Sequence, residues 1–286
     1  RTELMRAIFG LNSVASGEIR IGSFDGVASP AQRWSQRVGI VSEDRKTEGL
    51  ALGLSIADNL TLSRLDGLGP MNLVFPSRQR AVCRPWIDKI PIKCQGPEQI
   101  ISGLSGGNQQ KVAIARLLHA DVDVLLLDEP TRGIDVGSKA QIYQLIDELA
   151  ARGKAVLLIS SYIPELLGVC DRIAVLYGGL SVEEGLTDQI YYNPQHPYTL
   201  GLLNAVPKLT DGSDAPLRTI EGLPPLLIDP PDACAFADRC PFVMKICRQQ
   251  DPGYFTPVTD NRVACWLHHD MAATQRAGFD AARPQP

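Results

Sequence analysis

The stretch "SGLSGGNQQKVAIARLLHADVDVLLLDEPT", residues 102–131, decides the fold class of this chain. Its second half is an apolar run that ends in two adjacent carboxylates, Asp128 and Glu129. A short continuous apolar run is typical of a buried parallel strand. The two carboxylates are then expected at the carboxyl edge of a sheet, where open α/β folds bind ligands. In that place Asp128 suits Mg²⁺ and Glu129 suits a general base that polarises a water molecule.

The first half of the stretch favours a nucleotide site over the ordinary start of a helix. Taken alone, Asp-Glu-Pro also fits the start of a helix, with acids near its positive end and proline in its first turn. However, Ser105, Gly106 and Gly107 precede a second helical pattern, and glycines let bare backbone N–H groups approach an anion such as a γ-phosphate. An ordinary serine cap followed by flexible glycine is the alternative for these three residues alone. The combination of glycines and carboxylates indicates a nucleotide site.

Further apolar runs extend the α/β pattern outward from this stretch. Runs at 38–41, 155–159 and 173–176 are also predicted to be buried parallel strands. The tetrapeptide "SIAD" at 55–58 has the form of a capping box and predicts the start of a helix. The fold class is therefore predicted to be α/β.

The beginning of the chain raises a question about phosphate binding. Residue 1 is Arg1, and Leu4, Ile8 and Leu11 follow at once with helical spacing. No G-x-x-x-x-G-K-[ST] loop precedes the stretch at 102–131. An opening helix without a preceding strand leaves a parallel sheet short of its first members, so we interpret the chain as a fragment or a processed segment.

Composition limits the classes of function. The chain has 286 residues, of which 44% are hydrophobic and 21% charged, as in globular proteins. It contains no apolar run long enough to span a bilayer and no signal-peptide pattern, which predicts a cytosolic location. A net charge of -4 argues against a nucleic-acid partner.

A second, loop-rich module is expected after about residue 180. Proline becomes frequent there, and four thiols follow with spacing that suits a metal: Cys234, Cys240, Cys247 and Cys265. Four thiolates fit a [4Fe-4S] cluster or tetrahedral Zn²⁺, and reduced structural thiols are the alternative. The last residues, 271–286, are predicted to be a disordered tail.

The motifs together resemble the ATP-binding subunits of ABC transporters. "LSGGNQQK" is similar to the signature motif, "VLLLDEPT" to the Walker B strand with catalytic Glu129, and "RGID" to the D-loop ending at Asp135. The resemblance places Asp135 among the residues that bind the nucleotide and Mg²⁺. The resemblance implies a truncated P-loop NTPase domain over 1–180, with a helical subdomain over about 45–118. It assigns the signature role, contact with a partner's nucleotide, to six residues: Leu104, Ser105, Gly106, Gly107, Asn108 and Gln109.

Resemblance to a subgroup also accounts for the missing phosphate loop. "RTEL" is similar to the end of that loop in the second ATPase half of ribose- and xylose-type sugar importers. Arg1 then holds the position of the Walker A lysine, and Thr2 that of the Mg²⁺-binding hydroxyl. Glu43 replaces the Q-loop glutamine, and Ser161 replaces the switch histidine, although serine carries no proton near neutral pH. These replacements put hydrolysis in question, and the chain alone is expected to be inactive.

The second module resembles a different subgroup. Residues 193–199, "NPQHPYT", and the cysteine segment are similar to the C-terminal extension of oligopeptide and dipeptide importer ATPases. That extension is expected over 181–270, and its resemblance favours iron-sulfur over zinc. The chain thus looks like a hybrid with a junction near 179–182, through either a real fusion or two joined reading frames. The body suggests sugar as the solute and the extension suggests peptide.

The resemblance implies an ATP-binding importer subunit that uses ATP and Mg²⁺. Its implied partners are a second ATPase subunit, in a homo- or heterodimer, and membrane permease subunits, with a solute-binding protein acting indirectly. Such a subunit works at the cytoplasmic face of the membrane. The alternative is a degenerate half that donates its signature motif to a partner ATPase.

A chromosome-maintenance ATPase would need a long coiled-coil insertion, and about 60 residues between Glu43 and the signature leave no room for one.

Overall fold

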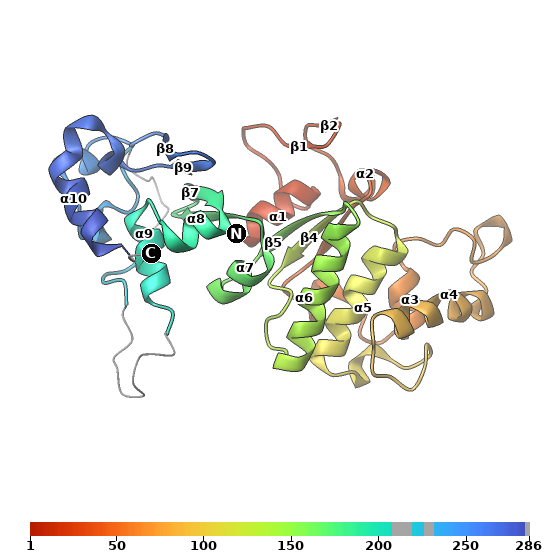
Figure 1. The fold of residues 1–286 in the computed structure, drawn as a ribbon. Helices are drawn as coiled ribbons and strands as arrows, with labels where there is room; N and C mark the ends of the chain where they lie inside the picture. Colours follow the sequence, from red (N-terminus) through yellow and green to blue (C-terminus); the bar gives the residue numbers. More distant parts are fainter. Residues whose placement is uncertain (208–218, 226–231, 284–286) are drawn as a thin grey trace. The chain divides into compact units, whose positions relative to one another are not determined.

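The computed structural model describes residues 1–207, 219–225 and 232–283. The chain forms two compact units, Arg1–Ser161 (unit 1) and Tyr162–Pro286 (unit 2) (Figure 1). The domain boundary near residue 180 rests on composition and resemblance rather than on compactness, and it stays a prediction.

Unit 1 is an α/β unit. Its helices are α1 (Thr2–Phe9), α2 (Pro30–Ser35), α3 (Ile56–Thr61), α4 (Pro76–Lys89), α5 (Gly106–His119) and α6 (Val136–Ala151), with a π-helical turn η1 (Arg45–Gly49) and 3₁₀ turns η2 (Pro70–Asn72) and η3 (Ile101–Gly103). Its strands are β1 (Arg20–Ile21), β2 (Phe24–Asp25), β3 (Val38–Val41), β4 (Val124–Asp128) and β5 (Ala155–Ile159). Strands β3, β4 and β5 form the predicted parallel sheet.

Helices pack on both faces of the sheet in unit 1. On one face, Met5 and Phe9 of α1 pack with Leu126 of β4. On the other face, α5 approaches β3 so closely that a Cβ added to Gly39 would lie 2.7 Å from Leu117. Because side chains alternate along a strand, Asp128 shares the face of Leu126 and therefore the face of α1.

The opening helix exists, but the expected apolar face is only partly correct: Ile8 packs against the core, and the other two residues do not. Leu4 and Leu11 are each 46% exposed, while Met5 and Phe9 are buried. The buried pair is spaced i, i+4, so both side chains lie on one face of the helix and pack with Val38 and Leu126 of the sheet. The capping box at Ser55 and Asp58 is confirmed, and it starts α3, which packs against α4 and α5.

Unit 2 contains an antiparallel sheet of order β6-β7-β9-β8. Its strands are β6 (Arg172–Tyr177), β7 (Leu180–Leu186), β8 (Phe255–Val258) and β9 (Asn261–Val263). Its helices are α7 (Ile163–Val169), α8 (Thr187–Tyr192), α9 (Pro197–Asn204) and α10 (Ala273–Ala282), with 3₁₀ turns η4 (Ala237–Arg239), η5 (Lys245–Arg248), η6 (Trp266–His268) and η7 (Asp270–Ala272).

Two expectations for unit 2 are corrected. The run at 173–176 was expected to be a parallel strand, yet β6 pairs antiparallel with β7. Gly178 and Gly179, with φ of 58° and 79°, make the tight turn between them. Residues 273–282 of the expected disordered tail form α10, because Phe279 is fully buried against Leu267 and its neighbours. Residues 284–286 lie outside the described part. Among the described residues, no helix is long and apolar enough to cross a membrane.

Candidate functional site

Three of the expected site residues meet at the carboxyl edge of the parallel sheet. Thr2 begins α1, Glu43 follows the end of β3 by two residues, and Asp128 is the last residue of β4. The Thr2 hydroxyl donates a long hydrogen bond, 3.5 Å, to Oε2 of Glu43. Parallel strands place their carboxyl ends together, so this meeting follows from the topology.

Asp128 is a buried carboxylate with an unused oxygen. Its side chain is only 2% exposed, and its Oδ1 has no hydrogen-bond partner among the described residues. Burial raises the pKa of Asp128, and a hydrogen bond from Thr2 opposes the increase. A buried polar atom without a partner is costly, and a hard cation such as Mg²⁺ would satisfy it. The Thr2 hydroxyl beside it adds a second oxygen of the kind that Mg²⁺ takes.

Glu129 has a backbone conformation that is uncommon for its residue type. Its φ is +46°, in the left-handed region, while its N–H donates to the carbonyl of Ile159 at 2.8 Å. The ladder between β4 and β5 thus continues through Glu129 while the chain turns sharply. Non-glycine residues held in this region often lie at functional sites.

Two further predicted residues, Arg1 and Ser161, lie near the end of β5. The Arg1 guanidinium donates to the carbonyl of Ser160 at 3.1 Å. Ser161 is the next residue, and it is exposed. The Arg1 cation and the Ser161 hydroxyl therefore both lie near the end of β5.

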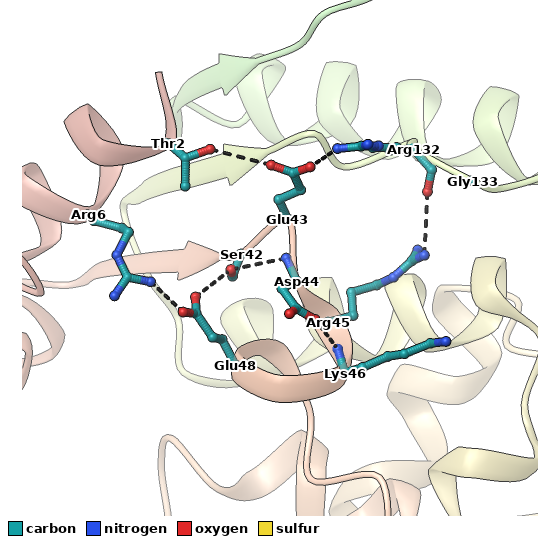
Figure 2. Close-up of a pocket in the computed structure, with 10 residues that line it drawn as sticks. All are labelled: Thr2, Arg6, Ser42, Glu43, Asp44, Arg45, Lys46, Glu48, Arg132 and Gly133. Carbon is teal, nitrogen blue, oxygen red and sulfur yellow. Dashed lines mark hydrogen bonds and ion pairs between the residues drawn. The ribbon is translucent and has the colours of Figure 1, made fainter.

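An open pocket of about 660 Å³ lies beside Thr2 and Glu43. Figure 2 shows Arg132 paired with Glu43 on one side and Arg6 paired with Glu48 on the other. The lining residues are Thr2, Arg6, Ser42, Glu43, Asp44, Arg45, Lys46, Glu48, Arg132 and Gly133.

Sequence reasoning identified Glu43 in this pocket but missed its other charged residues. Hydrogen bonding by Ser42, and then by Arg6, lowers the pKa of Glu48, which keeps that carboxylate ionised. A run such as "EDRK" at 43–46 is read most simply as a solvated turn. Its position directly after an apolar strand was the available signal.

The start of α5 leaves its first-turn N–H groups without a side-chain cap. Ser105 stands at the N-cap but makes no capping hydrogen bond, and its Oγ accepts instead from Nδ2 of Asn108 at 2.9 Å. Gly107 lies against α6, where an added Cβ would be 2.6 Å from Oγ of Ser138. An uncapped glycine-rich helix start can bind an anion.

Other residues of this segment make local contacts that hold its shape. Oδ1 of Asn108 accepts from the N–H of Lys93 at 2.9 Å, and Gln109 donates to the carbonyl of Leu104 at 3.2 Å. Asp135 caps α6 by accepting from the N–H of Ser138 at 2.9 Å, and this bond lowers the pKa of Asp135. The segment at 104–109 therefore lies beside the start of α6.

The four cysteines of unit 2 are reduced and near one another. Backbone N–H groups donate to each sulfur, for example from Met244 to Sγ of Cys247 at 3.5 Å. Burial raises the pKa of Cys240 to about 12, with smaller contributions from Cys234 and Cys247. Within the described ranges, however, no three His, Cys, Asp or Glu side chains are arranged to hold a metal ion. The expected metal site is therefore not supported by the side-chain arrangement.

Comparisons with families match the two parts of the chain separately. Residues 1–132 match the ABC transporter family, and residues 182–247 match the family described as oligopeptide/dipeptide transporter, C-terminal region. The chain is thus similar to two families in succession.

Comparison with individual proteins gives long partial matches. Over 180 residues, 63% of this chain, it is 46% identical to a ribose import ATP-binding protein of Lactococcus lactis and 43% identical to one of Bacillus subtilis. The matches span 37% and 36% of those relatives, so the chain covers well under half of their length.

Solved structures match the fold. A nucleotide-free ATP-binding cassette from an ABC transporter aligns with a TM-score of 0.56 at 19% identity, covering 65% of this chain and 75% of that one. A dimeric post-hydrolysis ATP-binding cassette bound to ADP and phosphate aligns with a TM-score of 0.55 at 22% identity, covering 65% and 80%. The aligned part of this chain therefore has the fold of these ATP-binding cassettes.

Proposed function

We propose, from the match of residues 1–132 to the ABC transporter family, that this chain is the ATP-binding subunit of an ABC importer. It couples ATP binding and hydrolysis at a dimer interface to solute transport through membrane permease subunits. It acts at the cytoplasmic face of the membrane and depends on a solute-binding protein only indirectly. The similarity to ribose import proteins supports sugar as the solute, and the C-terminal family match supports peptide.

The observation that carries this proposal is the unpartnered Oδ1 of Asp128 beside the Thr2 hydroxyl. P-loop NTPases hold Mg²⁺ with a Ser or Thr of the phosphate loop and an Asp at the end of a strand, and these two residues match both in type and in place. Bound Mg²⁺ would neutralise charge on the nucleotide phosphates.

Each of the other predicted site residues has a proposed role in nucleotide binding or hydrolysis. Arg1 contacts phosphate, Glu129 orients and deprotonates the attacking water, and Glu43 and Ser161 contact the reacting end of the nucleotide. The uncapped start of α5 and Asp135 face the partner subunit, where Leu104 to Gln109 contact its nucleotide.

Titration with a fluorescent ATP analogue tests the proposal on two chains. One is the chain as given, and the other is preceded by the strand and glycine-rich loop of the Lactococcus lactis relative. We expect Mg²⁺-dependent binding in the extended chain and much weaker binding in the chain as given. If the extended chain does not bind, the proposed function is wrong.

The alternative is a degenerate half that donates only its signature segment. Ser161 in place of an ionisable side chain and the ion pair of Glu43 with Arg132 support this alternative. The hydrolysis rate of the extended chain separates the two cases, with Glu129→Gln as the matched control. A rate that falls about 10²-fold or more in Glu129→Gln supports catalysis, and equal rates support the alternative.

We also propose that Cys234, Cys240, Cys247 and Cys265 hold a [4Fe-4S] cluster, with Zn²⁺ as the second candidate. Their proximity and the N–H groups directed at their sulfurs support this, because such hydrogen bonds tune iron-sulfur clusters. Binding would require deprotonation and a closer approach of the thiols. Iron, zinc and acid-labile sulfide analysis of anaerobically purified protein tests it, with Cys83→Ser as the control and Cys240→Ser as the variant expected to lose metal. Protein without either metal after anaerobic reconstitution contradicts it.

A further inference from the structure

The guanidinium of Arg45 joins three segments of unit 1. Its Nη1 donates to the carbonyl of Gly106 and to Oε1 of Gln110, both at 3.3 Å. Its Nη2 donates to the carbonyl of Arg132 at 3.4 Å. One planar group thus connects η1, the first turn of α5 and the loop that follows β4. Figure 2 shows its side chain directed at that loop.

The strength of these bonds does not explain why arginine is used here. All three are longer than the usual 2.9–3.0 Å and are individually weak. The ion pairs of the described residues do not include Arg45, and burial lowers its pKa. A half-buried cation without a carboxylate is a poor source of stability. Its forked donors, by contrast, can reach several acceptors at once, as a lysine ammonium cannot.

The same segment is tied to the site by a second contact. Glu43 lies two residues before Arg45, and its carboxylate contacts both the Thr2 hydroxyl and the Arg132 guanidinium. Arg132 is therefore held twice, by its side chain through Glu43 and by its carbonyl through Arg45. A displacement of Glu43 would move the loop at Arg132 and, through Arg45, the start of α5.

We propose that Arg45 is a positioning residue that couples the position of the glycine-rich start of α5 to the position of Glu43. The inference rests on the proposed function, because it assigns this contact the task of transmitting nucleotide contact at Glu43 to Gly106. A simpler role, in which Arg45 only fills space, would not link the responses of these separate segments.

Hydrogen exchange measured by mass spectrometry tests the bridge without any nucleotide. In Arg45→Ala we expect amide exchange over residues 106–110 and 130–134 to rise roughly two- to tenfold, the effect of losing a few modest hydrogen bonds. Arg45→Lys should restore only part of the protection. The control is Arg20→Ala, which removes an exposed arginine paired with Asp25 at 2.8 Å and should leave both segments unchanged. Unchanged exchange in Arg45→Ala would overturn the proposal.

A second measurement on the extended chain separates this proposal from the proposed function. Mg-ATP should change the exchange of residues 106–110 in the unsubstituted protein. In Arg45→Ala the nucleotide should still bind within about threefold of the original affinity, yet the change at 106–110 should disappear. If Arg45→Ala keeps that change, the positioning role is wrong. If the unsubstituted protein does not bind nucleotide, the proposed function fails, and the nucleotide-free exchange decides the bridge alone.

Discussion

Asp128 illustrates how a single residue can serve ligand binding at the expense of stability. Burial raises the pKa of its carboxyl, so the folded state binds a proton more tightly than the unfolded state. Folding therefore loses stability as the pH rises from the ordinary pKa through the raised one, and at neutral pH the ionised group is unfavourable. We expect Asp128→Asn to raise the melting temperature, by an amount equivalent to about 1 kcal/mol, and to weaken Mg-ATP binding by tenfold or more.

Calorimetry and nucleotide titration on the extended chain measure the two effects of Asp128→Asn. Asp66→Asn is the matched control, because Asp66 is exposed and makes only a 3.9 Å ion pair with Arg64. That control should change neither quantity much. A loss of stability in Asp128→Asn would show that the carboxylate is structural.

His196 makes the stability of unit 2 depend on pH. The ring is buried, its Nδ1 accepts from the N–H of Tyr198 at 3.0 Å, and its Nε2 has no partner in the described part of the chain. Burial lowers its pKa to about 3 from 6.5. Below about pH 6.5 the unfolded state therefore binds a proton at His196 that the folded state does not bind. The stability of the folded state falls as the pH decreases. By about pH 5 the loss should reach about 2 kcal/mol.

The variant His196→Asn isolates this effect. Asparagine can still accept the N–H of Tyr198, and the buried carboxylate of Glu183, whose raised pKa acts in the opposite direction, remains in both proteins. Urea unfolding at about pH 5 and about pH 7.5 should show a smaller pH dependence in the variant. Equal pH dependence in the two proteins would contradict the neutral, buried state of His196.

At the scale of elements, the contact between α5 and α6 requires a glycine. A Cβ on Gly107 would lie 2.6 Å from Oγ and 2.9 Å from Cβ of Ser138, so the helix starts would have to separate. We expect Gly107→Ala to destabilise unit 1 by about 1–3 kcal/mol, as overpacking does. Ser138→Gly in the same chain should recover most of the loss, whereas Gly53→Ala, which meets nothing within 4 Å, should cost little. Denaturant unfolding of the unsubstituted protein, Gly107→Ala, Ser138→Gly and the double variant gives the coupling energy, and additive effects would contradict the contact.

The elements also show what the sequence could and could not predict. Strands β3 and β5 coincide with the predicted apolar runs. The expected burial holds for β3, whereas every residue of β5 is half-buried or exposed, including Leu157 at 41%. The partner of β6 was missed, although the Gly178–Gly179 pair that makes its hairpin was visible. The bridge of Arg45 had no such signal, because it joins residues up to 87 positions apart and depends on the fold. The roles of the site residues stay predictions.

At the scale of the whole molecule, each unit has its own core, with Met5 and Phe9 in one and Phe279 in the other. Chains with separate cores often unfold in more than one step. We therefore expect two calorimetric transitions, with Gly107→Ala lowering one and His196→Asn altering the pH dependence of the other. Hydrogen exchange near each midpoint assigns the transitions to residues 1–161 or 162–283. If Gly107→Ala and His196→Asn act on the same single transition, the two units unfold as one cooperative body.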